Sequence, residues 1–242
     1  MLRIGYVSLF PEMILQTLEH SIMGRAQKSG AFEPAFANPR DFATDNHRTV
    51  DDSSYGGGPG MVMLAPLVLQ AARSILTEGA IVISCDPAGE KFTQETAEEL
   101  SRASQVVFLC GHYEGMDERA AKILNARPMT IGDFVVTGGE VPALLMTDAI
   151  VRLLPDVLGD PESHADDSHS SDGLLGFPLY TKPQEVEGHE VPDVLLSGNH
   201  KEIAKWRRTQ QLKRTRQNRP DLFAKARLKP GDLDLLATED SK

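Results

Sequence analysis

Short apolar runs alternate with helical patterns along the first two thirds of the chain, and this alternation strongly restricts the fold. Strands that are apolar throughout must be buried on both faces, which is typical of a parallel sheet covered by helices. The sequence therefore predicts an α/β domain. The expected strands are 2–7, 80–85, 105–110 and 129–136, and the expected helices are Pro11–Gln27, Pro66–Thr77, 93–103, 115–125 and Pro142–Leu154.

The alternation stops at residues 155–177, which are dense in Pro, Gly, Ser, Asp and His and have no periodicity. Such composition is typical of a linker. Beyond it, Asn199 or Ser197 is expected to cap a basic helix at about 200–215, and Pro220 to begin another. We expect an α/β domain at 1–159, a flexible linker at 160–175 and a small all-helical domain at 176–242.

Positive charge is concentrated in one part of an acidic chain. The net charge is −10, yet residues 200–230 contain eleven lysines and arginines and only two acids. A solvated basic helix is the plain interpretation. A local positive field can also bind a phosphate backbone, and this density favours an anionic partner, although charge alone does not separate RNA from DNA or an acidic protein.

The sequence also indicates the cellular compartment in which the protein works. No apolar run is long enough to span a membrane, and the first residues lack the pattern of a signal peptide. Cys85 and Cys110 each end a short apolar run and form no C-x-x-C pair. We expect them to be reduced, buried packing residues of a cytoplasmic protein.

Three glycine-bearing loops each follow an apolar strand: residues 86–89, 111–115 and 131–140. Ligands of parallel sheets bind at the carboxyl ends of the strands, so these loops predict one shared pocket. The loops offer backbone groups and an aromatic side chain but no cationic phosphate clamp. This content suits an adenosine with little net charge better than a triphosphate.

The segment GGGPGM at 56–61 lets the backbone approach a ligand closely. A nucleotide hydrolase that uses it as a phosphate cradle is one hypothesis, but no G-K-[ST] follows, so a tight structural turn is favoured. His47, Arg48, Asp51 and Asp52 precede it. They could contact a phosphate and a base edge, or form a solvated ion cluster.

Eight strings in order along nearly the whole chain resemble the bacterial tRNA (guanine-N1)-methyltransferases of the knotted SPOUT class. The resemblance implies a trefoil knot at the end of the α/β domain, a homodimer with active sites shared between chains, and methyl transfer from S-adenosylmethionine to N1 of the guanine just 3′ of the anticodon of tRNA. The strings are GYVSLFPEM, HRTVDD, YGGGPGM, CGHYEGMDER, IGDFVVTGGE, DSHSSDGLL, EVPDVLLSGNH and KWRR.

The resemblance also implies a cofactor pocket in the three loops. Many family members have Tyr where this chain has Phe134, a mild change, and Arg where it has His112, which alters the charge there. Glu114 is either a cofactor-side acid or a loop anchor, and its place between glycines favours the pocket. The implied cofactor-binding residues are Ser84, Pro87, Gly111, Tyr113, Glu114, Ile131, Gly132, Asp133, Phe134, Val135, Val136, Gly138, Gly139 and Pro142.

Guanine N1 carries a proton at neutral pH, so its methylation needs a general base near N1 and a cation or donor near O6. The resemblance implies Arg152 for the oxygen and an aspartate of the linker as base. We assign Asp167, which directly precedes Ser168; Asp166 stays open, because this linker is about one residue longer than in some relatives. The family also implies Mg²⁺, but no spacing identifies a metal site.

The basic helix holds the expected tRNA contacts, Arg207, Arg208, Lys213 and Arg214. Trp206 either stacks on a base or, as we favour, anchors a small core. A catalytically inactive RNA-binding protein on the same scaffold is the alternative function. The pocket strings, Arg152 and the Asp167 candidate argue against it.

Overall fold

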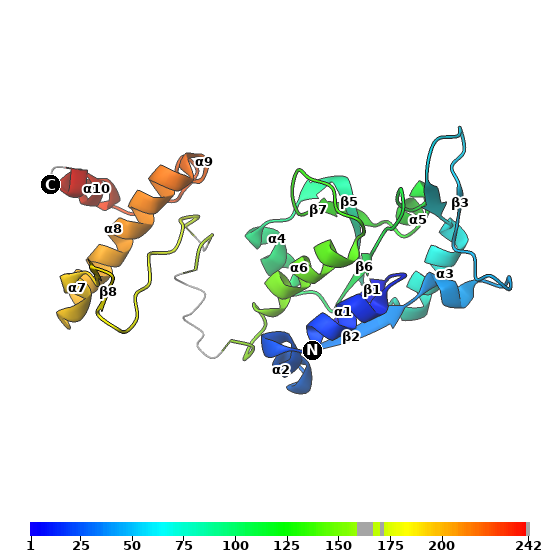
Figure 1. Ribbon diagram of the computed structural model, residues 1–242, viewed down its shortest axis with the longest axis horizontal. Coiled ribbons are helices and arrows are strands. Elements are labelled where there is room, and N and C mark those ends of the chain that lie inside the picture. Colours follow the sequence, from blue (N-terminus) through cyan, green and yellow to red (C-terminus); the bar gives the residue numbers. More distant parts are fainter. Residues whose placement is uncertain (159–166, 170–171, 241–242) are drawn as a thin grey trace. The chain divides into compact units, whose positions relative to one another are not determined.

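The computed structural model describes residues 1–158, 167–169 and 172–240, except the side chains of residues 238–240. The chain divides into two compact units, Met1–Gly159 and Asp160–Lys242 (Figure 1). Much of the expected linker, including Asp166 and His164, lies outside the described residues.

A parallel sheet organises the first unit. Within the described residues its five strands lie in the order β2-β1-β6-β5-β7, and every neighbouring pair is parallel. The predicted α/β class is therefore confirmed. The strands are β1 (Leu2–Val7), β2 (Phe32–Ala37), β5 (Ile81–Lys91), β6 (Gln105–Leu109) and β7 (Arg127–Thr130).

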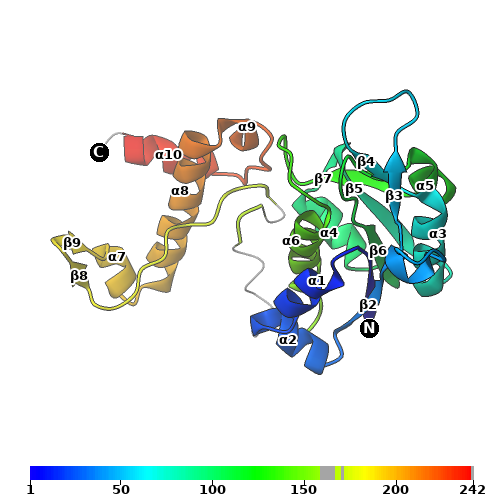
Figure 2. The same ribbon diagram turned by 45° about the vertical axis from the view of Figure 1, so that its right-hand side comes forward.

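Helices cover both faces of this sheet (Figure 2). On one face lie α1 (Pro11–Leu18), α2 (Ser21–Lys28), α4 (Gln94–Leu100) and α6 (Glu140–Val151). On the other lie α3 (Ala65–Ile75) and α5 (Glu118–Ile123), with the short 3₁₀ helix η1 (Pro39–Phe42) beside α3.

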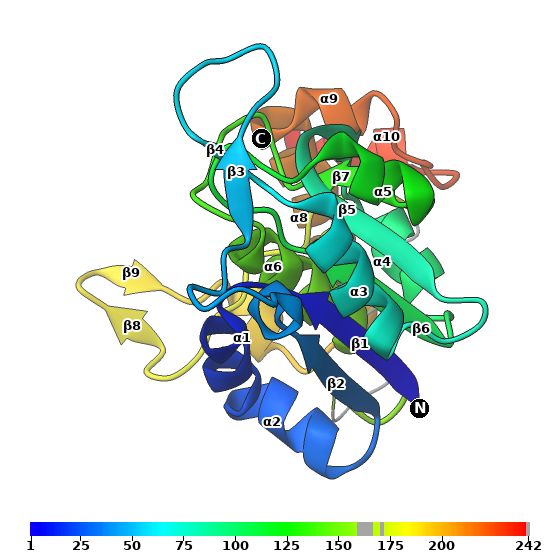
Figure 3. The same ribbon diagram turned by 90° about the vertical axis from the view of Figure 1, so that its right-hand side faces the viewer.

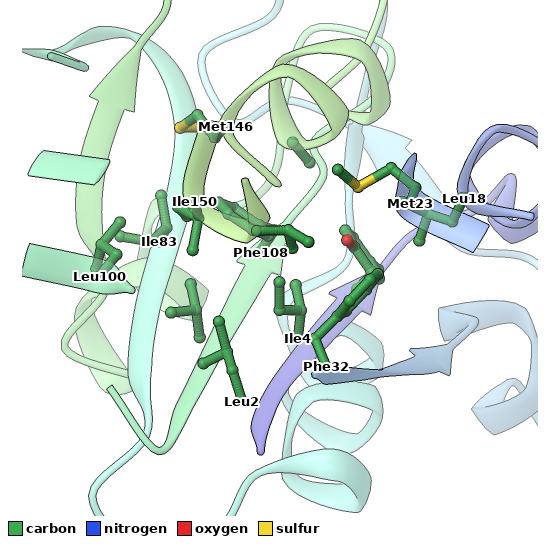
Figure 4. Packing of buried hydrophobic residues seen from close by; sticks show 14 of the residues in the cluster. Leu2, Ile4, Leu18, Met23, Phe32, Ile83, Leu100, Phe108, Met146 and Ile150 are labelled. Carbon is green, nitrogen blue, oxygen red and sulfur yellow. The ribbon is translucent and has the colours of Figure 1, made fainter. Parts of the chain in front are cut away.

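The central strand β6 is buried on both sides. Val106 and Phe108 belong to the core beneath α1, α2, α4 and α6, whereas Val107 and Leu109 belong to the core beneath α3 and α5. Figure 4 shows Phe108 close to Ile150 of α6. Alternate side chains of a strand point to opposite faces, so a continuous apolar run supplies both cores.

The prediction of one helix at Pro11–Gln27 is wrong, because the chain turns between α1 and α2. His20 is extended and Ser21 has a φ of 53°. A Cβ on Gly24 would lie 2.2 Å from the carbonyl oxygen of Glu19, so glycine permits this close turn. The apolar spacing continues across the break and therefore did not reveal it.

The strand expected at 129–136 ends at Thr130, and the rest of that run is a loop. Phe134, Val135 and Val136 have 56%, 82% and 39% of their surface exposed, so they are not sheet core. The sequence analysis also missed β2, whose Pro34 is tolerated because β2 is an edge strand.

The GGGPGM segment lies at the tip of a hairpin formed by β3 (Asp51–Ser53) and β4 (Met61–Met63). Figure 3 shows its loop extending beyond the sheet. A phosphate cradle of the P-loop type joins a strand to a helix N-terminus. The hairpin has no such geometry, and this weighs against the nucleotide hydrolase.

The described part of the second unit is mostly helical. The long helix α8 (His200–Asn218) begins as predicted after Asn199, whose side chain accepts a hydrogen bond from the Glu202 N–H. A small core joins Leu174, Leu212 and Leu236. A short hairpin, absent from the prediction, and three further helices complete it: β8 (Glu185–Val186), β9 (His189–Glu190), α7 (Asp193–Leu196), α9 (Pro220–Phe223) and α10 (Asp232–Asp240).

Replacing Phe108 with alanine should lower the free energy of unfolding of the first unit by about 3–5 kcal/mol, because it leaves a cavity between β6 and α6. Far-ultraviolet circular dichroism during urea unfolding measures this loss. The single tryptophan, Trp206, belongs to the second unit, so its fluorescence is an internal reference. Phe108→Leu, which retains more volume, should lose less; equal losses would contradict the cavity argument.

Candidate functional site

The three predicted segments meet in one pocket, at an irregularity within β5 and at the carboxyl ends of β6 and β7. The prediction that the first strand ends before residues 86–89 is wrong, because β5 continues to Lys91. The shared pocket expected from the strand-end loops is therefore present. Its wall combines apolar side chains, glycine backbone and two acids, Asp86 and Glu114. The lining residues are Cys85, Asp86, Pro87, Gly111, His112, Tyr113, Glu114, Gly115, Met129, Thr130, Ile131, Phe134, Val135, Val136, Thr137, Gly138, Gly139 and Pro142.

An irregularity in β5 forms the first wall. Cys85 and Glu90 both pair with Met129, so the residues between them bulge from the ladder. Asp86 accepts a hydrogen bond from the Ala88 N–H at 2.8 Å, which stabilises the turn. A Cβ on Gly89 would lie 2.3 Å from the nitrogen of Met129, so this close crossing requires glycine.

The third loop passes directly against the second. The N–H of Gly139 donates to the carbonyl of Gly111 at 2.8 Å, and His112 forms an isolated bridge with Gly138. A Cβ on Gly139 would lie 2.6 Å from the Cα of Cys110. The glycines expected to contact a ligand therefore also let two backbone segments approach each other.

A buried carboxylate, that of Glu140, is contacted by Ser8 and by the pocket-lining residue His112. Glu140 is 2% exposed and accepts a hydrogen bond from the Ser8 hydroxyl at 2.7 Å. The Nδ1 atom of His112 lies 3.8 Å from its second oxygen, and the imidazole packs against Phe10. Sequence reasoning noted the departure at His112 but not Ser8 or Glu140, which lie 132 residues apart.

The GGGPGM hairpin also reaches this wall. The Glu114 N–H donates to the carbonyl of Met61, and a Cβ on Gly60 would lie 2.4 Å from the Glu114 side chain. On the neighbouring residue, the Tyr113 hydroxyl accepts a hydrogen bond from Arg40 at 3.2 Å. The hairpin is thus a support for the acid-bearing loop. Of the polar residues before it, Arg48 forms an exposed ion pair with Asp41.

Most of the implied cofactor-binding residues line the pocket, but three do not. Ser84 is buried within β5 and pairs with Leu109. Gly132 is covered by the Phe134 ring, since a Cβ there would lie 2.4 Å from it. The side chain of Asp133 is 92% exposed and pairs with Lys91. The residues in the lining are Pro87, Gly111, Tyr113, Glu114, Ile131, Phe134, Val135, Val136, Gly138, Gly139 and Pro142.

The two cysteines are free thiols, as predicted, and Cys110 is buried. The prediction that Cys85 is buried is wrong, because it is only partly buried and lines the pocket. A hydrogen bond with Cys85, together with burial, raises the pKa of Cys110 well above its ordinary value. The Cys110 thiol therefore stays protonated at neutral pH.

The two catalytic candidates belong to different units. Arg152 follows α6 as its C-cap in the first unit, and Asp167 lies in the second, on a half-buried turn. Among the described residues, no group of three or more His, Cys, Asp or Glu side chains is placed to hold a metal ion.

The expected tRNA contacts on α8 differ in their surroundings. The Arg207 guanidinium lies 4.7 Å from the centre of the Phe177 ring, and Arg214 donates to the carbonyl of Gly176. Arg208 is paired with Asp172 and Asp232, an arrangement that the sequence did not indicate. The ring of Trp206 lies 6.2 Å from that of Tyr180, which is 48% exposed, and Trp206 is not part of the small core of this unit, so the core-anchor interpretation is not confirmed.

No described helix has the length and apolar character needed to cross a bilayer.

Replacing Gly139 with alanine should destabilise the first unit by about 1–3 kcal/mol, because its Cβ meets backbone atoms that cannot rotate away. Urea unfolding measures the change. Gly111→Ala is the matched control, since a Cβ there lies at an ordinary 3.5 Å from its nearest neighbour, the Met116 methyl. Equal stability of both variants would show that the crossing is looser than described.

Comparison with known proteins agrees with this geometry. The family described as tRNA (Guanine-1)-methyltransferase TrmD matches residues 2–225. A tRNA (guanine-N(1)-)-methyltransferase of Dictyoglomus turgidum is 49% identical over 236 residues, covering 98% of this chain and 96% of its own length. Proteins of the same name from Staphylococcus aureus strain MRSA252 and Staphylococcus carnosus are 51% and 50% identical, each covering 97% of this chain and 96% of their own length. The chain therefore belongs to the TrmD family of tRNA (guanine-1)-methyltransferases.

Proposed function

We propose that this protein transfers a methyl group from S-adenosylmethionine to N1 of the guanine on the 3′ side of the anticodon of tRNA. The observation that carries the proposal is the strand-end pocket, in a chain that matches its family over nearly its whole length. Relatives about half identical to it bear the name of this activity.

The pocket suits a sulfonium donor better than a nucleoside triphosphate. Its described lining contains the acids Asp86 and Glu114 but no lysine or arginine. A cationic sulfonium is favoured by such acids, whereas phosphates are repelled by them. Phe134, Val136 and Pro142 supply apolar surface for an adenine, and the glycine backbone supplies groups for its polar edge.

We assign two tasks to this chain: removal of the proton from guanine N1 and stabilisation of the negative charge that develops on the guanine. Asp167 takes the proton from guanine N1, and Arg152 stabilises the negative charge that develops on O6. The N1 electron pair then forms a bond to the methyl carbon while the carbon–sulfur bond breaks, leaving S-adenosylhomocysteine. We infer these two roles from the resemblance to the family, with Asp166 as the alternative base.

A homodimer with shared active sites is part of the proposal. Apolar side chains are exposed on α1 and on α6, which contact each other: Met13 and Val141 are each 50% exposed and Leu145 is 49% exposed. A second copy would bury such a surface.

The remaining family features are also proposals. We place S-adenosylmethionine binding in residues 1–159 and tRNA binding in 176–242, joined by the linker at 160–175, in a cytoplasmic enzyme that uses Mg²⁺. The close crossing of Gly139 and Cys110 is compatible with a trefoil knot. The catalytically inactive alternative has no support from the relatives named above, which bear the name of an enzyme.

Methyl transfer to tRNA transcripts tests the activity directly. With labelled S-adenosylmethionine, transcripts with guanine just 3′ of the anticodon should be labelled at N1, and transcripts with another base there should not. Failure of the purified protein to bind S-adenosylmethionine in calorimetry would overturn the proposal, and ATP is the control ligand expected not to bind.

Replacing Asp167 with alanine should abolish turnover, because no base then removes the N1 proton. Binding of S-adenosylmethionine, measured by calorimetry, should be unchanged. Asp193→Ala, which removes an exposed carboxylate of the same unit, is the control and should stay active. A fully active Asp167→Ala variant would make Asp166 the candidate to test next.

Replacing Arg207 with glutamine should weaken tRNA binding. Arg207 lines an open hollow with His200 and Lys229, where a phosphate could be held. Loss of one phosphate contact should reduce the slope of log affinity against log salt by about 1. Fluorescence anisotropy of labelled tRNA at several salt concentrations measures this, and an unchanged slope would remove Arg207 from the contact set.

A further inference from the structure

The turn that carries Asp167 is tied to the helices of its own unit. The Leu175 N–H donates to the Thr215 hydroxyl at 2.9 Å, and Arg214 donates to the carbonyl of Gly176 at 3.1 Å, so both contacts are with α8. Leu174 is buried in the small core with Leu212 of the same helix. The strand-like segment after the turn therefore has a defined place on α8.

Two further hydrogen bonds close the turn itself. The His169 N–H donates to the carbonyl of Leu174 at 2.9 Å, and the Gly176 N–H donates to the Ser168 hydroxyl at 2.9 Å. Ser168 is the neighbour of Asp167. Any constraint on residues 172–176 is therefore transmitted to the backbone that bears the aspartate.

Ion pairs of Arg208 also hold the segment that follows the Asp167 turn. The Arg208 Nη1 lies 2.5 Å from a carboxylate oxygen of Asp172, and its Nε and Nη2 bind the two oxygens of Asp232 at 3.0 and 2.6 Å. The side chains of the three residues are only 14%, 15% and 4% exposed. Removing one partner of a bidentate pair shielded from water leaves the other charge without compensation, which costs more than the loss of an exposed ion pair.

The second carboxylate joins α10 to the same arginine. Asp232 begins α10 and also accepts a hydrogen bond from the Lys229 N–H at 2.7 Å. Burial raises the pKa of Asp232, but the hydrogen bonds from Arg208 and Lys229 outweigh it, so the pKa lies below its ordinary value. Asp232 is therefore ionised at neutral pH and engages Arg208 on two of its nitrogens.

We propose that Arg208, Asp172 and Asp232 form a clamp that positions the turn bearing the general base Asp167 on α8. The proposal rests on the proposed function, since it assigns this role for the methyl transfer. Arg208 is then a positioning residue, and the basic density of α8 serves two purposes. Both arginines line the open hollow, and Arg208 is in addition bound to Asp172 and Asp232.

The Asp172→Asn variant distinguishes two roles of Arg208, the positioning of the turn that bears Asp167 and a contact with a tRNA phosphate. If Arg208 binds tRNA, removing an adjacent acid should strengthen tRNA binding and leave kcat unchanged. If the clamp positions Asp167, the same substitution should lower kcat about 10- to 100-fold, because a small displacement of a catalytic group has a cost of this size. S-adenosylmethionine affinity should be unchanged.

Arg208→Gln and the double variant complete the test. Arg208→Gln should lower kcat with little change in the salt dependence of tRNA binding. The double variant Asp172→Asn/Arg208→Gln should be no slower than Arg208→Gln alone, because both substitutions break the same interaction between Arg208 and Asp172. Arg208→Lys, which keeps the charge but not the bidentate geometry, should recover only part of kcat.

Arg219 and Asp221 provide a matched control. They form an ion pair of similar length in the same unit, but the two side chains are 45% and 59% exposed. Arg219→Gln and Asp221→Asn should leave kcat at the wild-type level. A comparable fall in kcat for these variants would show that the loss of any ion pair in this unit lowers kcat, and it would overturn the proposal of a clamp.

The outcomes separate failure of the clamp from failure of the function. If the wild-type protein methylates tRNA and Asp172→Asn keeps full kcat, the clamp is wrong and the function stands. If the wild-type protein transfers no methyl group, the proposed function fails first. Circular dichroism monitors folding: should Asp172→Asn and both Arg208 variants all unfold the second unit, the three residues stabilise it as a whole and the positioning role is rejected.

Discussion

The backbone crossing at Gly139 is the constraint on which the pocket depends. Its N–H is bonded to the Gly111 carbonyl, and its α-carbon leaves no room for a side chain against Cys110. A second crossing, of Gly89 over Met129, holds the first loop in the same way. Rigid crossings of this kind place polar backbone groups without the entropic cost of ordering mobile side chains.

The same crossings explain why apolar residues are exposed at the pocket. Phe134, Val135 and Val136 extend past the end of β7 rather than continuing the strand. Exposed apolar surface beside two acids and glycine backbone is unfavourable without a ligand. The packing of the sheet therefore does not account for this apolar surface.

The two units differ in the charge that they present. The first unit lines its pocket with acids, and the second concentrates the lysines and arginines. Within the second unit the cations are not equivalent, although Arg207 and Arg208 line the same hollow. Arg208 is bound to two shielded carboxylates, whereas the Arg207 guanidinium lies over the Phe177 ring.

Local pattern predicted the α/β class, a pocket shared by three glycine-bearing segments and a helix cap at Asn199 or Ser197, because each depends on residues close together in the chain; the structure has Asn199 as the cap. The resemblance to the family, rather than local pattern, named eleven of the pocket-lining residues. Only the tertiary structure decided the break between α1 and α2, the buried Ser8–Glu140 pair and the partners of Arg208. The Ser8–Glu140 pair and the partners of Arg208 join segments far apart in sequence, and no periodicity or spacing encodes which side chains will meet when the chain folds. The break between α1 and α2 depends on a close backbone contact between Glu19 and Gly24, which apolar spacing does not encode.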